Sequence, residues 1–231
     1  MSTRPLRSDA EASRTRILEA ARALFGEQGS PEVTMAEVAL RAGVSRATVF
    51  NHFGSKQVLV EGVTEEVFAG YEAILDRALA DETTPVPVLV RARFHVMADG
   101  IAADPRFYRT AFREISRVTL GLAEGGVARQ ARQRAVERLV HLLTRGQARG
   151  ELDAGFEARA LATAFDSLVF GTLTHWLYDD ASESLVDRML AAADVFLGPV
   201  GRVPATWAGP DPDLWREGDA GFGNTPGGTE A

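Results

Sequence analysis

Apolar residues recur every three or four positions along almost the whole of this 231-residue chain. Near the N-terminus, for example, Ile17, Ala21 and Leu24 fall on one face of a helix. No run of alternating apolar and polar residues is long enough to indicate a strand. Because 45% of the residues are hydrophobic, the chain has enough apolar surface to bury a core, and we predict an all-α protein.

Helix start and stop signals divide the first 54 residues into three helices. A capping-box pattern at Ser8 predicts the start of the first helix, and Gly29 predicts its end. A second capping box, at Thr34, precedes a short helix that ends at Gly43, and Ser45 is placed to cap a third. These three helices form the predicted head, residues 1–54.

A long periodic stretch follows the head, from Ser55 to about Ala80, and ends before two prolines. It is the expected lever between the head and a helical domain for ligand binding and dimerisation, residues 55–197. Ser182 is placed to cap the last helix, and Gly198-Pro199 predicts its end. Residues 198–231 are rich in glycine and proline and should form a flexible tail. Between the lever and the tail, helices are expected at about 87–102, 105–117, 124–149, 157–179 and 182–197.

Charge is unevenly distributed along the chain. The formal net charge is −7, but residues 1–60 carry eight Lys and Arg against six Asp and Glu. The remainder carries 17 against 26, so the acidic excess lies outside the head. This asymmetry permits contact between the head and nucleic acid.

Several classes of protein are excluded by composition. The chain has no cysteine, which excludes disulfides, thiolate zinc sites and a cysteine nucleophile. The polar N-terminus lacks the apolar run of a signal peptide, and no later segment reaches the roughly 18 apolar residues needed to span a membrane. We therefore expect a cytoplasmic protein without membrane contact.

The segment TMAEVALRAGVSRATVFNHF has the pattern of a helix-turn-helix. Ala39 is small where two crossing helices would touch, Gly43 suits a left-handed turn, and Val44 is an apolar plug between the helices. The second helix, capped by Ser45, would then project into a major groove about 12 Å wide. Its expected outward positions are Arg46, Ala47, Thr48 and Asn51, and its expected inward positions are Val49 and Phe53.

From Thr15 to Val60 the sequence resembles the DNA-binding head of the TetR family of regulators. The resemblance includes the LF and glycine at the end of the first helix, the helix-turn-helix, and the lysine that follows it. It implies a homodimer that binds a palindromic operator as a repressor and is released by a small molecule.

The resemblance also implies a role for each matching residue of the head. Thr34 and Lys56 would hold phosphates, and Phe50 stands where the family usually has tyrosine, so a phosphate hydrogen bond is absent there. Whether Arg46 contacts a base or a phosphate is open. The implied DNA-binding set is Thr34, Ser45, Arg46, Ala47, Thr48, Phe50, Asn51, His52 and Lys56.

Two copies packed as a four-helix bundle would cover the broad apolar faces of the last two helices, as the resemblance implies. The alternative is that these faces pack within one copy. The faces comprise Leu161, Phe165, Leu168, Val169, Thr172 and Trp176, and Leu185, Met189, Ala192, Ala193 and Phe196.

Aromatic and polar side chains of the middle helices are candidates for a pocket that takes an unknown small-molecule effector. The alternative for each is a place in the core. The histidines of this domain lack metal-ligand spacing, so we predict neither a metal nor a cofactor. The candidate ligand-binding residues are Phe94, Met97, Phe112, His141, Phe165 and Trp176.

An enzyme is the main competing class of function. No nucleophile elbow, zinc-protease helix or phosphate-binding loop occurs in the sequence, and GFGNTPG near residue 221 lacks a flanking strand and helix. The sequence therefore predicts a regulator rather than an enzyme. A second competitor is an architectural DNA-binding protein that responds to no ligand.

Overall fold

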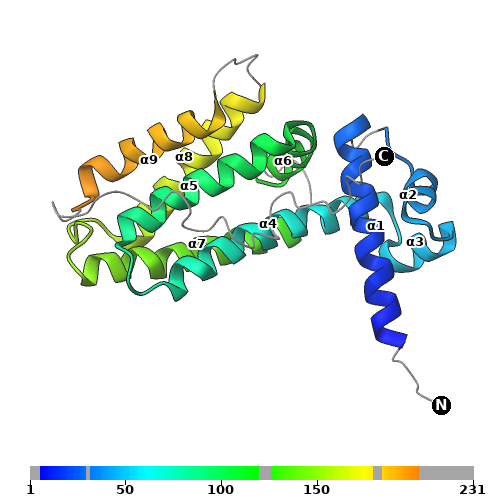
Figure 1. Cartoon of the computed structure of the whole chain (residues 1–231), viewed down its shortest axis with the longest axis horizontal. Helices are drawn as coiled ribbons and strands as arrows, with labels where there is room; N and C mark the ends of the chain where they lie inside the picture. Colours follow the sequence, from blue (N-terminus) through cyan, green and yellow to red (C-terminus); the bar gives the residue numbers. More distant parts are fainter. Residues whose placement is uncertain (1–5, 30–31, 120–125, 179–183, 203–231) are drawn as a thin grey trace, which may run out of the picture. The chain divides into compact units, whose positions relative to one another are not determined.

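The computed structural model describes residues 6–29, 32–119, 126–178 and 184–202. Within these ranges the chain forms nine α-helices and no strand, which confirms the predicted fold class (Figure 1). None of the described helices is long and apolar enough to cross a membrane. The helices are α1 Leu6–Gln28, α2 Met35–Ala42, α3 Arg46–Phe53, α4 Lys56–Ala80, α5 Val86–Ala103, α6 Pro105–Thr119, α7 Gly126–Ala148, α8 Ala158–Tyr178 and α9 Leu185–Val200.

The chain divides into two compact units. The first unit comprises Met1–Val67 and Asp104–Arg129, and the second comprises Phe68–Ala103 and Gln130–Ala231. Helix α4 therefore begins in the first unit and ends in the second. This division differs from the predicted boundary after residue 54, because the first unit continues to Val67 and also includes α6, which packs against α1.

Packing in the first unit brings α1 against both α2 and α6. Arg41 of α2 donates two hydrogen bonds to the Glu27 carboxylate of α1, at 3.0 and 2.7 Å. The Thr110 hydroxyl of α6 donates to the Phe25 carbonyl of α1, at 3.3 Å. The buried apolar residues of these helices and of α3 include Ile17, Leu18, Ala21, Phe25, Val38, Val49, Phe53 and Phe107.

In the second unit, α9 packs against α5 and α8. The Phe165 ring lies edge-on to Phe94 of α5 and to Phe196 of α9, with ring centroids 4.6 and 5.4 Å apart. Leu161, Met189 and Ala193 are also buried within this one copy. Most of the apolar faces assigned to dimerisation are therefore core, and the alternative interpretation holds for them.

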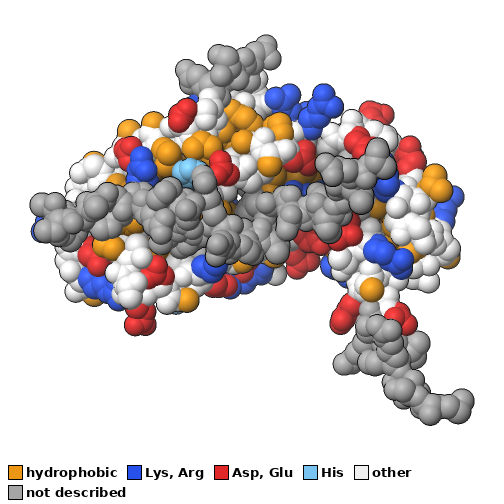
Figure 2. Space-filling model, in the orientation of Figure 1, with side chains coloured by type: hydrophobic (Ala, Val, Ile, Leu, Met, Phe, Trp, Pro, Cys, Tyr) orange, Lys and Arg blue, Asp and Glu red, His pale blue; other side chains and the backbone are white. Residues whose placement is uncertain are grey.

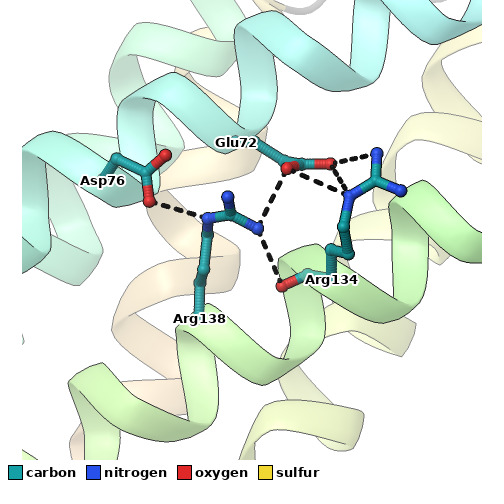
Figure 3. A network of polar contacts seen from close by, with 4 residues as sticks. All are labelled: Glu72, Asp76, Arg134 and Arg138. Carbon is teal, nitrogen blue, oxygen red and sulfur yellow. Dashed lines mark hydrogen bonds and ion pairs between the residues drawn. The ribbon is translucent and has the colours of Figure 1, made fainter.

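Figure 3 shows four charged side chains that join α4 to α7. Both oxygens of Glu72 pair with arginines, one with Arg134 and the other with Arg138, each at 2.9 Å. Arg138 also donates to Asp76, at 2.7 Å. Because Glu72 is buried, these two arginines compensate its charge and hold the second half of α4 in the second unit.

Three predicted helix ends differ from those in the structure. Helix α1 already includes Ser8, so the predicted cap there is wrong. Ser184 caps α9 by accepting from the Asp187 N–H, whereas the predicted cap Ser182 lies outside the described residues.

Helix α9 continues beyond Gly198-Pro199 to Val200. The end of this helix pairs with the segment that follows α7. The Asp153 N–H donates to the Val200 carbonyl at 2.8 Å, and the Arg202 N–H donates to the Glu151 carbonyl at 2.7 Å. The predicted tail lies outside the described residues from position 203 onward.

Asp81, which follows α4, accepts hydrogen bonds from the N–H groups of Thr83 and Thr84, both at 2.9 Å. Partial burial opposes its ionisation, but the hydrogen bonds from Thr84 and Thr83 outweigh that effect and lower its pKa from 3.8 to about 2. The ionised group therefore contributes stability above pH 3.8, and the contribution is lost as the pH falls through about 2.

We expect Asp81→Ala to lower the free energy of unfolding by about 1–2 kcal/mol at pH 7. The difference from the wild type should shrink as the pH is lowered from 4 toward 2, because protonation weakens the same hydrogen bonds. Urea titrations at several pH values measure this difference in the free energy of unfolding. Glu82→Ala is the matched control, since Glu82 is exposed and makes none of these hydrogen bonds. A difference independent of pH would contradict the assignment.

Candidate nucleic-acid interface

Helices α2 and α3 are joined by a three-residue turn whose geometry follows from its sequence. The Thr34 hydroxyl accepts from the Glu37 N–H and the Glu37 carboxylate accepts from the Thr34 N–H, so the predicted capping box is present. Gly43 adopts a left-handed conformation with φ of 64°, which few other residues adopt without strain. The Val44 N–H then donates to the Ala39 carbonyl at 3.0 Å and closes the turn.

Helix α3 presents a polar outer face, as predicted. The Ser45 side chain caps it by accepting from the Thr48 N–H at 3.0 Å. Val49 and Phe53 are buried against the rest of the first unit. Arg46, Ala47 and Asn51 are exposed, while Thr48 and His52 are partly exposed.

Phe50 lies on the outer part of α3, with 39% of its surface exposed. The Arg46 guanidinium lies 5.5 Å from the centroid of its ring. At an exposed site such a cation–π contact contributes about 0.5–1 kcal/mol. The phenylalanine lacks the hydroxyl of a tyrosine, but its ring restricts where Arg46 points. This contact could not be read from the motif, because it depends on the rotamers of both side chains.

Glu37 interacts with both Thr34 and Lys56. The Thr34 hydroxyl donates to the Glu37 carboxylate at 2.7 Å, so a phosphate would have to compete for that hydrogen. The hydrogen bonds from Thr34 lower the pKa of Glu37, and the nearby charge of Lys56 lowers it further. Glu37 therefore stays ionised at neutral pH and brings both predicted phosphate-binding residues toward one carboxylate.

Ser55 is a residue that the sequence interpretation passed over. Its hydroxyl accepts from the Val58 N–H at 3.2 Å, so it caps α4. The N-terminus of a helix favours an anion, and here it lies directly after the C-terminal glycine of α3. A serine immediately before a periodic stretch was the available signal. Figure 2 shows basic side chains among acidic ones at the surface around α2 and α3, and the basic ones are available to a phosphate backbone.

The candidate ligand-binding residues are only partly brought together. Phe94 and Phe165 touch in the second unit, where Met97 is also buried. Trp176 is partly exposed and His141 is exposed, so His141 is not enclosed by its own unit. Phe112 is buried but belongs to the first unit. Within the described residues no cluster of His, Asp or Glu could hold a metal ion.

Comparison with known proteins identifies relatives of this fold and motif. A family model described as bacterial regulatory proteins of the tetR family matches residues 17–63. The transcriptional repressor BepR of Brucella suis is 27% identical over 187 residues, which cover 78% of this chain and 88% of BepR. The transcriptional regulator TtgR of Pseudomonas putida is 27% identical over 184 residues, covering 75% of this chain and 84% of TtgR.

Solved structures share the same helical layout. SmeT, the repressor of the Stenotrophomonas maltophilia multidrug efflux pump SmeDEF, matches with a TM-score of 0.69 at 25% identity. The match covers 88% of this chain and 100% of SmeT. FadR of Thermus thermophilus, solved with lauroyl-CoA, has a TM-score of 0.61 at 24% identity, covering 85% of this chain and 100% of FadR, and shares the fold.

Proposed function

Because the chain belongs to the TetR family of bacterial regulatory proteins, we propose that it represses transcription from a palindromic operator until a small molecule releases it. The predictions of an all-helical regulator rather than an enzyme are confirmed by its relatives. A repressor must reach its operator, so we expect the protein in the cytoplasm.

One observation carries the proposal. Helix α3 buries Val49 and Phe53 inward and leaves Arg46, Ala47 and Asn51 exposed. A helix held in this way can enter the major groove, where base edges differ in their donors and acceptors. We propose that Arg46, Ala47 and Thr48 face base edges. Asn51 and His52 contact the backbone or nearby bases, and Thr34, Lys56 and the capped start of α4 bind phosphates.

We propose a homodimer formed through the outer face of α8 and α9. Val195 is 71% exposed, although it is a large aliphatic side chain. Gly171 and Gly198 have no atom within 4 Å of where a Cβ would lie, so neighbouring side chains in this copy do not require glycine there. A partner helix packed at close range would require it. The outer face consists of Ala160, Ala164, Ser167, Gly171, His175, Tyr178, Ala191, Val195 and Gly198.

The effector would act through α4, since this helix alone among the described ones begins beside α3 and continues into the second unit. Two heads of a dimer must fit successive major grooves about 34–36 Å apart. A ligand bound in the second unit that displaces α4 would change this separation and weaken operator binding. SmeT has been solved with triclosan and FadR with lauroyl-CoA, which supports a ligand-responsive function for a protein of this fold.

Selection of bound sites from random DNA by the purified protein tests this function. We expect enrichment of a palindrome whose half-sites lie about one helical turn apart. Failure to enrich any palindrome would contradict the proposal. Equal binding to DNA of any sequence, unchanged by a library of small molecules, would instead support an architectural DNA-binding protein.

Arg46 and Lys56 should respond differently to removal. We expect Arg46→Ala to weaken binding to the selected operator by about 10- to 100-fold and to relax specificity at one base pair. Lys56→Ala should weaken binding to all sequences alike and reduce the salt dependence, because it removes a phosphate contact. Binding titrations on operator variants at several salt concentrations measure both. Equal loss for Arg46→Ala on every variant would assign Arg46 to a phosphate.

A further inference from the structure

Arg93 of α5 is a cation in the interior of the second unit, with only 2% of its surface exposed. Its Nε and Nη1 atoms have no hydrogen-bond partner among the described residues. Its guanidinium lies 4.1 Å from the ring centroid of Tyr71 and 4.5 Å from that of Phe165. The charge is thus held against two aromatic rings, while part of its donor capacity is unused.

The acidic group that acts on Arg93 is already paired with another arginine. Asp166 of α8 influences its charge, but Asp166 accepts hydrogen bonds from both Nε and Nη2 of Arg132. Arg93, Arg132 and Asp166 together therefore carry a net charge of one positive unit. Burial lowers the pKa of Arg93, as expected for a cation with too few counter-charges.

Such an arrangement is costly for a purely structural residue. An unsatisfied buried donor on a charged group costs more than one on a neutral group, and an apolar side chain of similar volume would avoid that cost. The cation–π contacts and a hydrogen bond with Tyr71 offset part of it, but they leave Nε and Nη1 without acceptors. The unused donors and the unbalanced charge both call for an anion that is not part of the chain.

We propose that Arg93 binds the acid group of a small organic anion, with the rings of Tyr71 and Phe165 beside it and an apolar body against Phe94. This inference rests on the proposed function, because it names the chemical class of the effector. An acid group supplies the missing negative charge and an acceptor for one of the two unused donor atoms. The neighbouring aromatic rings suit a planar or short apolar body.

The same position would connect the ligand to α4. Tyr71 belongs to α4, the helix that begins at Lys56, immediately after α3. An acid group that attracts the Arg93 guanidinium changes its contact with the Tyr71 ring. The inferred site therefore lies against the one element through which the proposed release would act.

Isothermal titration of the intact, DNA-free protein tests the inference with matched probes. The probes are benzoate, phenylacetate, 2-naphthoate and octanoate, each paired with its primary amide, which has the same body without the charge. We expect at least one acid to bind about 10- to 100-fold more tightly than its amide, as a charge-assisted hydrogen bond to a buried arginine implies. Affinities equal within each pair across the panel would overturn the proposal.

Variants test whether the preference for the acid over its amide depends on Arg93. Arg93→Met should reduce the affinity for the acid to that for the amide and leave the affinity for the amide unchanged. Arg91→Met is the matched control on the same helix, because Arg91 is partly exposed and pairs with Asp194 at 2.9 Å. Arg93→Lys should retain part of the preference. An acid preference that survives in Arg93→Met would also overturn the proposal.

The two proposals fail separately. A selected palindrome combined with no acid preference would leave the repressor function standing and remove this site. Acid binding that depends on Arg93, without any enriched palindrome, would leave the site standing and remove the function. The acid comparison on the wild type does not depend on whether a variant folds.

Discussion

Val195→Arg is expected to convert the proposed dimer into a monomer and to weaken operator binding by at least about 100-fold. Val195 is an exposed aliphatic residue of α9, and the substitution would place a charge from each copy in the surface that the partner covers. The loss is large because two linked heads bind with a high effective concentration, which a monomer lacks. Sedimentation equilibrium measures the oligomeric state, and titration with the selected operator measures affinity.

Ala102→Arg is the control, since it adds the same charge at an exposed position on α5, outside the outer face of α8 and α9. It should remain dimeric with wild-type affinity. The free energy of unfolding at equal protomer concentration separates loss of the dimer from loss of the fold. A Val195→Arg protein that stays dimeric would place the interface elsewhere on the molecule.

The helix-turn-helix could be predicted closely because its signals are local. Thr34 and Ser45 satisfy free N–H groups within the next turn of chain, and Gly43 meets a backbone requirement at its own position. Such signals act within a few residues, so the surrounding fold does not alter them. The contact between Arg46 and Phe50 was not predicted, because it depends on side-chain rotamers.

The apolar faces of α8 and α9 show where sequence reasoning stops. Periodicity identified Phe165 and Met189 as residues that must be covered, but it carries no information about what covers them. In the structure the packing of α5, α8 and α9 buries these residues, and only the remaining outer face is left for a partner. Which segment covers an apolar face depends on packing between segments that are distant in the chain. A single sequence does not specify that packing.

Arg93 was missed for a related reason. It occupies the same helical face as Val86, Val90 and Met97, all of which are buried, so an arginine interrupts an apolar stripe. A long basic side chain at such a position usually extends its charge to solvent. Only the structure shows that its guanidinium remains inside, between Tyr71 and Phe165. The signal in the sequence was the arginine within a stripe of apolar residues.

Phe165→Ala should produce the largest loss of stability, lowering the free energy of unfolding by about 3–5 kcal/mol. Phe165 is fully buried and its ring contacts Phe94 of α5 and Phe196 of α9. The truncation removes apolar burial, leaves a cavity and takes away one of the two rings beside Arg93. Urea titration followed by circular dichroism measures the change.

Phe156→Ala makes the same chemical change at a position that is 48% exposed, so it should cost less than about 1 kcal/mol. The difference between the two variants isolates the contribution of burial. Equal losses would mean that burial of the Phe165 ring contributes little to stability, whereas a loss several times larger means that the ring helps to hold α5, α8 and α9 together.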